Sequence, residues 1–352
     1  MRQLLLFILL FTTIYVKGQI GIKVDDRAAE QLLQFLDKAD TSQINNIVQL
    51  PANQIMEQLY VDATDSIVPS FKETLYNFIP TDSTTGIYYN LYKAYKKRKD
   101  IRSLLDKLQN QTDYDDIINR ALYFFPTDYK FKNDYNVFYS LTGWKWGDAQ
   151  KVQVQLDDKN DIVSLGTGKP ALIFNLRIIA DLYGKDTDSR IKTLKNVMSH
   201  EIFHALLDDY SNDIWKTTDI NSSDDFLRYY LLNEGIAHYI TQRDEIKTNY
   251  KDFKENEQHA FDTLNVKYNH IHQLNISEEE KIKMFGKGLY GRFWNKYICI
   301  SGMFMAYHIE NILGIEQLRQ CINKGFNNFI ETYNNLATEN DNLHKANINI
   351  EM

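Results

Sequence analysis

The chain has 352 residues, a formal net charge of −7 and a hydrophobic content of 43%. It is long enough to bury a sizeable core, and its acidic balance argues against a nucleic-acid partner, which would require a basic surface. Two cysteines are too few for a disulfide scaffold. Cys299 and Cys321 either pair across neighbouring helices or remain two separate buried thiols.

The first 18 residues have the composition of a secretory signal peptide. Arg2 gives a short basic start, and the apolar stretch from Leu4 to Val16 is too short to span a bilayer comfortably. Val16 and Gly18 match the small residues required before a cleavage site, so we expect cleavage after Gly18; an uncleaved membrane anchor is the alternative. The mature protein is expected to be secreted or periplasmic, with no membrane association after cleavage.

Residues 19–125 are expected to form an N-terminal helical region. Apolar residues from Ala28 to Leu36 recur at helical spacing, and prolines separate the helical segments that follow. The basic run from Lys96 to Lys99 is interpreted as a solvated helix face, with a binding patch as the alternative. We expect this region to pack against the part of the chain that follows.

The pattern changes from helical spacing to alternation after Tyr129. Residues 135–141 and 151–156 alternate as half-buried strands do, and residues 171–176 are predicted to form a third strand. A small sheet therefore precedes the next helix. An edge strand of such a sheet can hold an extended peptide by main-chain hydrogen bonds; a sheet that only completes the core is the alternative.

A long helix is predicted after this sheet. Asp186 to Ser189 offers capping side chains, and the helix is expected to run to about Asp209. Its predicted buried stripe consists of Ile191, Leu194, Met198, Ile202 and Ala205.

This helix contains an H-E-x-x-H motif at residues 200–204. Residues i and i+4 share one helix face, so His200 and His204 can bind one zinc ion. Glu201 lies beside the remaining coordination position, where a carboxylate can accept a proton from a water whose pKa the metal lowers. Two surface histidines on an amphipathic helix are the alternative interpretation.

A third zinc ligand is predicted on the following helix. Glu234 stands in the largely apolar segment 226–240, where a buried carboxylate without a cation would be costly. Gly235 and Ala237 are small enough for two helices to approach closely, which would let the carboxylate reach a metal held by the neighbouring helix. An ordinary glutamate that faces water is the alternative.

H-E-x-x-H followed by N-E-G-x-A at residues 233–237 resembles the gluzincins, zinc peptidases whose third ligand is a glutamate on a later helix. The whole chain also resembles uncharacterised secreted bacterial families described as zinc-dependent peptidases. The resemblance implies that His200, His204 and Glu234 bind Zn²⁺ and that Glu201 is the general base. It is strongest over residues 196–242 and weaker over residues 286–333.

The chain also departs from this family. His204 and Glu234 are separated by 29 residues (234 − 204 − 1), more than in the aminopeptidase type, and the extra length is expected to form a loop near the cleft. Those enzymes place an oxyanion-stabilising tyrosine three residues before a glycine, whereas Cys299 occupies that offset from Gly302. We assign the role to Tyr297, with Tyr290 or simple packing as the alternatives.

Two residues lie one helical turn after a predicted ligand. His238 follows Glu234 and Asp208 follows His204, so either can orient its ligand from outside the coordination sphere. Ordinary surface or core positions are the alternative. Further along, Ser277 is a predicted N-cap, and residues 293–313 are predicted to be a central apolar segment. The polar tail from 337 to 352 is expected to fray.

The sequence thus predicts a predominantly helical α+β protein with a zincin-like catalytic region over residues 126–336. We expect an exported zinc peptidase that acts on peptide or protein substrates, with zinc activating a water and Glu201 as the general base. The alternatives are an inactive zincin-fold binding protein and a zinc hydrolase of a non-peptide amide. The sequence does not indicate the oligomeric state.

Overall fold

A computed structural model describes residues 20–62, 68–143, 147–215 and 220–348. The predicted signal peptide lies outside these ranges. The described chain is mainly helical and contains one small mixed sheet, which confirms the predicted α+β class. None of the described helices combines the length and apolar character that a membrane span requires.

The sheet has five strands in the order β1-β2-β5-β3-β4. They are β1 (Ile22–Asp25), β2 (Tyr135–Ser140), β3 (Ala149–Leu156), β4 (Ile162–Leu165) and β5 (Lys169–Asn175). The pairs β1–β2 and β2–β5 are parallel, whereas β3 is antiparallel to both β5 and β4. The three predicted strands are confirmed as β2, β3 and β5, but β1 and β4 were not predicted.

The strand β1 ties the start of the described chain to the sheet. Ile22 is in register with Tyr135, and the backbone N–H of Gly21 donates to the carboxylate of Asp134 across 113 positions of sequence. The region 19–125 is therefore not purely helical, because its first residues complete the sheet of the region that follows.

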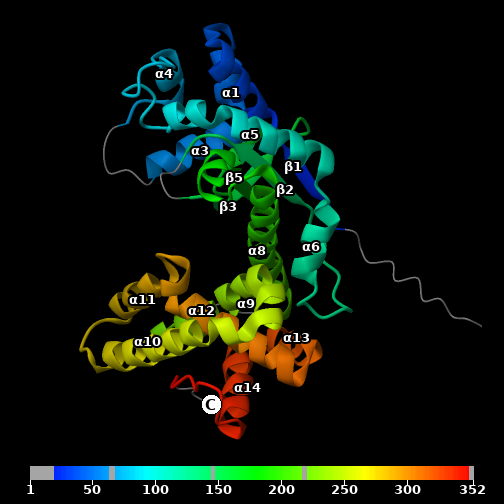
Figure 1. Ribbon diagram of the computed structural model, residues 1–352, viewed down its shortest axis with the longest axis vertical. Helices are drawn as coiled ribbons and strands as arrows, with labels where there is room; N and C mark the ends of the chain where they lie inside the picture. Colours follow the sequence, from blue (N-terminus) through cyan, green and yellow to red (C-terminus); the bar gives the residue numbers. More distant parts are fainter. Residues whose placement is uncertain (1–19, 63–67, 144–146, 216–219, 349–352) are drawn as a thin grey trace, which may run out of the picture.

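Helices cover both faces of the sheet (Figure 1). Those of the first half are α1 (Arg27–Lys38), α2 (Ile44–Gln49), α3 (Pro51–Asp62), α4 (Phe71–Tyr76), α5 (Leu91–Gln111), α6 (Tyr114–Leu122) and α7 (Leu176–Leu182). Successive side chains of β2 and β5 point to opposite faces of the sheet and pack in two separate cores. Phe138 and Ile173 pack in the cluster that includes α3, whereas Tyr139 and Phe174 join the large cluster that includes α5 and α8.

The second half is helical throughout its described part. Its helices are α8 (Thr187–Ile214), α9 (Ser223–Asn249), α10 (Lys254–Gln273), α11 (Glu278–Gly286), α12 (Tyr297–His308), α13 (Ile315–Lys324) and α14 (Phe326–Glu339). Short helical turns are η1 (Thr41–Gln43), η2 (Tyr250–Phe253), η3 (Lys287–Leu289), η4 (Phe293–Asn295) and the π-helical η5 (Ile309–Leu313). Ser277 caps α11 as predicted, in a capping box with Glu280.

The helix α8 runs from the sheet to the helical half of the molecule (Figure 1). It has 28 residues, which corresponds to about 42 Å at 1.5 Å per residue. Asp186 and Ser189 form a capping box at its start, as the sequence suggests. All five residues of the predicted stripe are buried, but the helix continues beyond Asp209 to Ile214. At the end of α8, the indole N–H of Trp215 donates a hydrogen bond to the carbonyl of Ile322 (2.8 Å) and fixes the helix end to α13.

The helices α9 and α12 cross in backbone contact. A Cβ atom added to Gly302 would lie 2.0 Å from the carbonyl oxygen of Leu231, and one added to Gly235 would lie 2.5 Å from the carbonyl carbon of Gly302. Gly235 was expected to let the helix of Glu234 approach the helix of the two histidines. The structure corrects this expectation, because the close approach at Gly235 is to α12.

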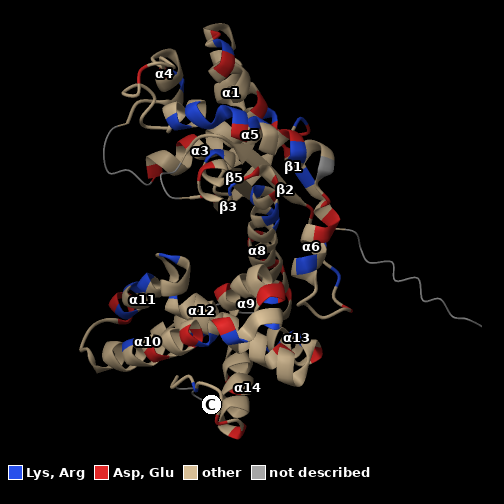
Figure 2. Cartoon of the chain, in the orientation of Figure 1, with Lys and Arg blue, Asp and Glu red and all other residues tan. Residues whose placement is uncertain are grey.

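Two further expectations concern the basic run at 96–99 and the polar tail at 337–352. The basic run lies on α5 (Figure 2), where Lys97 and Arg98 pair with Asp181 and Asp37 respectively, as expected for a solvated face. The tail does not fray over its described part: the carbonyl of His344 accepts from Tyr333, and residues 346 and 348 are buried. Apolar residues among the polar ones therefore anchor it.

The two cysteines remain separate. Cys299 lies on α12 and Cys321 on α13, and both are buried free thiols. Of the two alternatives that the sequence left open, the structure has the unpaired one.

A buried ion cluster joins α9 to η5, the helical turn directly after α12. Glu310 is 6% exposed and accepts hydrogen bonds from Arg243, Lys247 and Tyr239. Burial alone would raise the pKa of Glu310, but these hydrogen bonds outweigh it and lower the pKa to about 2.

The substitution Gly302→Ala tests the backbone contact between α9 and α12. The added methyl group collides with a backbone oxygen that cannot rotate away, so the free energy of unfolding should fall by about 1–3 kcal/mol. Urea denaturation measures this loss. Gly286→Ala is the matched control, because its added Cβ has no neighbour closer than the ring of Phe226 at 4.0 Å. Equal stabilities of the two variants would contradict the contact.

The Glu310 cluster predicts a particular loss of stability in acid. A carboxyl group whose pKa is lowered in the folded state stabilises the fold above its unfolded pKa, near 4.5, and loses that contribution as the pH falls towards 2. The contribution is on the order of 3 kcal/mol. Glu310→Gln should therefore be less stable than the wild type at pH 7, and its unfolding free energy should decline less between pH 4.5 and 2. If the unfolding free energies of the two proteins changed with pH in parallel, this account would be wrong.

Candidate metal centre

Three of the predicted site residues converge between α8 and α9. The Nε2 atoms of His200 and His204 lie 3.0 Å apart. The carboxylate of Glu234 lies 3.7 Å from Nε2 of His200 and 3.6 Å from Nε2 of His204. All three side chains are largely buried but keep a small exposed fraction. The packing of α9 on α8 thus brings Glu234 to the motif despite their long separation in the sequence.

These separations suit one zinc ion. Ligand atoms placed about 2.0–2.1 Å from zinc in tetrahedral geometry are about 3.3 Å from one another. The separations here lie on either side of that value: 3.0 Å between the two nitrogens, and 3.7 and 3.6 Å from them to the two oxygens of the Glu234 carboxylate. Two imidazole nitrogens and a carboxylate oxygen are also the donor types that zinc prefers. The residues present therefore fit the ion.

A hydrogen bond to His204 determines which of its ring nitrogens faces the site. Nδ1 of His204 lies 2.7 Å from Oδ1 of Asn233, an acceptor, so Nδ1 carries the proton and Nε2 presents a lone pair. Asn233 is held in turn by donating to Tyr229 (3.1 Å). Burial, and then the nearby His204 and His238, lower the pKa of His200 well below its usual value. A cation between these facing nitrogen and carboxylate oxygen atoms would stabilise the arrangement.

His238 lies beside these ligands. Its Nδ1 donates to the backbone carbonyl of Glu234 (2.9 Å) and lies 3.4 Å from the carboxylate of the same residue. His200, Glu234 and His238 also form a group whose possible ligand atoms lie within 4.8 Å of one another. We favour His204 over His238 as the ligand because Nδ1 of His238, the atom that faces Glu234, donates to a carbonyl and so has no free lone pair, whereas Nε2 of His204 lies 3.0 Å from Nε2 of His200. His238 then orients Glu234, one of the two roles that the sequence allowed.

Glu201 is next to the metal ligands, on the cleft side of α8. Burial raises the pKa of its carboxyl group to about 7, with smaller upward contributions from Glu234 and Asp148. His204 and Lys151 act in the opposite direction. A carboxyl group in this position can hold or release a proton near neutral pH.

The site opens into a cleft of about 640 Å³. Its walls come from the first half of α8, the second half of α9, and the segments before β3 and α12. Residues that line it include Asp148, Lys192, Lys195, Asn196, His200, Glu201, His238, Thr241, Asp244, Glu245, Phe293 and Lys296. The cleft therefore runs along α8 from the metal ligands towards the start of that helix.

The other predicted residues lie elsewhere. Tyr297 is buried and packs on Gly288, and burial raises the pKa of its hydroxyl to about 12. It does not belong to the described lining of the cleft. Tyr290 is 76% exposed. Asp208 pairs with Lys151 of β3 and not with His204.

Three cleft or ligand-supporting residues were missed from the sequence. Asn233 supports His204, but asparagine in a helix has many ordinary roles; its place directly before Glu234 was the available signal. Asp148 and Lys296 line the cleft from segments before β3 and α12. No motif marks them, because only the packing of distant segments brings them to the site.

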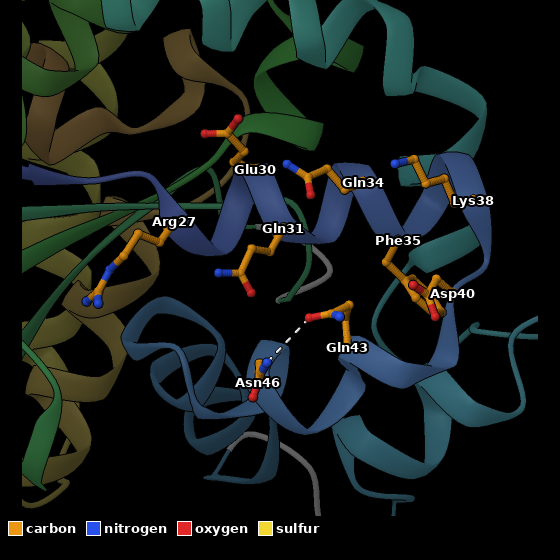
Figure 3. A pocket seen from close by; sticks show the side chains of 9 residues that line it. All are labelled: Arg27, Glu30, Gln31, Gln34, Phe35, Lys38, Asp40, Gln43 and Asn46. Atoms are coloured by element: carbon orange, nitrogen blue, oxygen red, sulfur yellow. Dashed lines mark hydrogen bonds between the residues drawn. The ribbon is translucent and has the colours of Figure 1, made fainter.

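A second cavity, of about 520 Å³, lies between α1 and the turn that follows it (Figure 3). Its lining is polar and mixed in charge, and Gln31 of α1 points towards Gln43 and Asn46. It shares no residue with the metal ligands, and its donor types do not favour a metal. We assign it no chemistry.

The fold and the site define a mainly helical protein with a His-His-Glu constellation on two adjacent helices that could hold a metal ion. Residues 44–342 match the family described as "Putative zinc dependent peptidase (DUF5700)", and the chain belongs to this family. A search of curated proteins found no match, and a search of solved structures found none either. The family description supports zinc and peptide hydrolysis in general terms.

The contact between His204 and Asn233 predicts a loss of metal affinity. Asn233→Ala leaves all three ligands in place but frees the ring of His204, so zinc affinity should fall by about 10- to 100-fold. Competition with a chromophoric chelator measures the affinity. Asn327→Ala, an exposed change on α14, serves as the control. Unchanged affinity in Asn233→Ala would show that His204 does not depend on this partner.

Proposed function

We propose that the protein is an exported zinc-dependent peptidase with a gluzincin-type, zincin-like centre. The observation that carries the proposal is the convergence of His200, His204 and Glu234, whose possible ligand atoms lie 3.0–3.7 Å apart, beside a cleft that His200 and Glu201 line. Membership of a family described as zinc-dependent peptidases supports the same reaction class.

Zinc bound here would lower the pKa of a water molecule and polarise a substrate carbonyl. Glu201 is the general base of the proposed reaction: it accepts a proton from the attacking water and delivers it to the leaving nitrogen. A carboxyl pKa near 7 is consistent with both halves of that exchange. His204, fixed by Asn233, and Glu234, oriented by His238, keep their positions while the proton moves.

An extended peptide is the substrate that the cleft suits best. β4 pairs only with residues 154–156 of β3, so Ala149 to Val152 have β5 on one side and no described strand on the other. Asp148, directly before this stretch, lines the cleft together with Glu201. Free main-chain groups beside the base can align a peptide as an added strand.

Export remains part of the proposal and rests on residues 1–18 alone. N-terminal sequencing of the mature protein from an expressing bacterial cell tests it. A new N-terminus at Gln19 supports export by signal cleavage, and retention of Arg2 contradicts it.

Glu201→Gln separates catalysis from metal binding. The change removes the base but keeps the shape of the side chain, and it alters none of the proposed metal ligands. Cleavage of a peptide library should therefore fall by about 10²- to 10⁴-fold while zinc stays bound. Zinc content by atomic absorption and cleavage by mass spectrometry are the two measurements. Glu279→Gln, an exposed change on α11, is the matched control.

The outcomes distinguish the candidate functions. Absence of stoichiometric zinc in the wild type, or its retention in His204→Ala, would refute the metal site. Zinc without any cleavage sensitive to Glu201→Gln would favour a zincin-fold binding protein. Cleavage of amides other than peptides, with the same sensitivity, would favour a non-peptide hydrolase.

A further inference from the structure

Lys296 enters the cleft from the turn directly before α12. Its backbone N–H donates to the carbonyl of Phe293 (3.3 Å), and the ring of Phe293 packs 5.4 Å from the ring of His238. Lys296 and Phe293 both line the cleft with His200 and Glu201. The turn therefore packs against His238, beside the candidate ligands, and it leads directly into α12, which is buried along its whole length.

Lys296 is also the cation at this end of the cleft whose charge is not already engaged. Lys151 pairs with Asp208, and Arg120 pairs with Asp116. Lys296, by contrast, forms no ion pair within the described parts of the chain.

Two other lysines of the cleft lie on α8, one to two or more turns before His200. Lys192 and Lys195 stand 8 and 5 residues before His200 on α8, about 12 and 7.5 Å along the helix axis. Lys296, in contrast, lines the cleft where His200, Glu201 and His238 meet, three residues after Phe293, whose ring lies 5.4 Å from that of His238.

We propose that Lys296 is a catalytic residue whose ammonium group donates a hydrogen bond to the substrate carbonyl oxygen as negative charge develops on it. This is the role that the sequence pattern assigned to Tyr297, the next residue along the chain. The inference rests on the proposed peptidase function and names the donor that the resemblance left open.

The proposed step balances without a further reactant. The oxygen of water forms a bond to the carbonyl carbon, the π electron pair moves to the carbonyl oxygen, and Glu201 takes the proton of the water. Lys296 donates a hydrogen bond and keeps its proton throughout. When the carbon–nitrogen bond breaks, the electron pair returns to the carbonyl and the leaving nitrogen takes the proton from Glu201.

Two features make lysine suitable for this position. Glu201, Glu234 and Asp148 place three carboxyl groups around the site, so a cation there is favourable electrostatically. The contact between Gly235 and Gly302 fixes α12 against the helix that carries Glu234, so the backbone of Lys296 needs no rearrangement when charge develops.

The test compares Lys296→Met, Lys296→Arg and Lys287→Met, an exposed control on the same connecting segment. Loss of one oxyanion donor lowers kcat by about 10²- to 10³-fold. We expect that loss in Lys296→Met, with KM and zinc content unchanged, partial recovery in Lys296→Arg, and wild-type kinetics in Lys287→Met.

A binding measurement gives a readout that does not depend on turnover. The affinity of the zinc-loaded protein for a phosphinic peptide, an anionic tetrahedral analogue, should weaken by about 100-fold in Lys296→Met. The affinity for the uncleaved substrate, measured in the Glu201→Gln background, should stay the same with and without Lys296→Met.

Different results overturn the inference and the proposed function. If the wild type cleaves peptides, Glu201→Gln does not, and Lys296→Met keeps its kcat and its affinity for the phosphinic peptide, the inference alone is wrong. A rise in KM without a fall in kcat also contradicts it, because that pattern indicates substrate binding only. A wild type without zinc, or with cleavage that ignores Glu201→Gln, overturns the proposed function and with it the inference.

Discussion

The contact between Gly235 and Gly302 is the constraint on which the arrangement of the site depends. Two helix backbones meet there with no side chain between them, so α9 and α12 have one possible separation. Glu234 precedes the contact on α9, and Lys296 lies at the head of α12. A carboxylate and a cation from positions more than 60 residues apart (296 − 234 = 62) are thereby fixed relative to each other, beside α8, which supplies the histidines and Glu201.

Burial sets the electrostatics of this arrangement. Removing the carboxyl group of Glu201 from water raises its pKa to about 7, and the same effect lowers the pKa of His200. Both shifts favour neutral groups, whereas Glu234 presents a carboxylate to two lone pairs. A divalent cation would make this set of acceptors favourable, which supports the metal centre that we propose over a purely structural cluster.

The sequence predicted the elements better than it predicted their neighbours. The helix of the motif, its capping box and its buried stripe follow from local spacing, as do three strands of the sheet. β1 could not be predicted, because four residues carry little periodicity and their partner lies 113 positions away. Gly235 was correctly singled out as a close-packing residue but assigned the wrong helix. Asn233 and Lys296 act through tertiary packing, which no local pattern encodes.

The pairing of β1 with β2 has a consequence for how the chain folds. The strand that is synthesised first must wait until residue 135 is available, and closing so long a loop slows the formation of the sheet. Until then β2 exposes one edge and β1 has no partner strand. The start of the described chain therefore covers an edge that would otherwise be open to pairing with another chain.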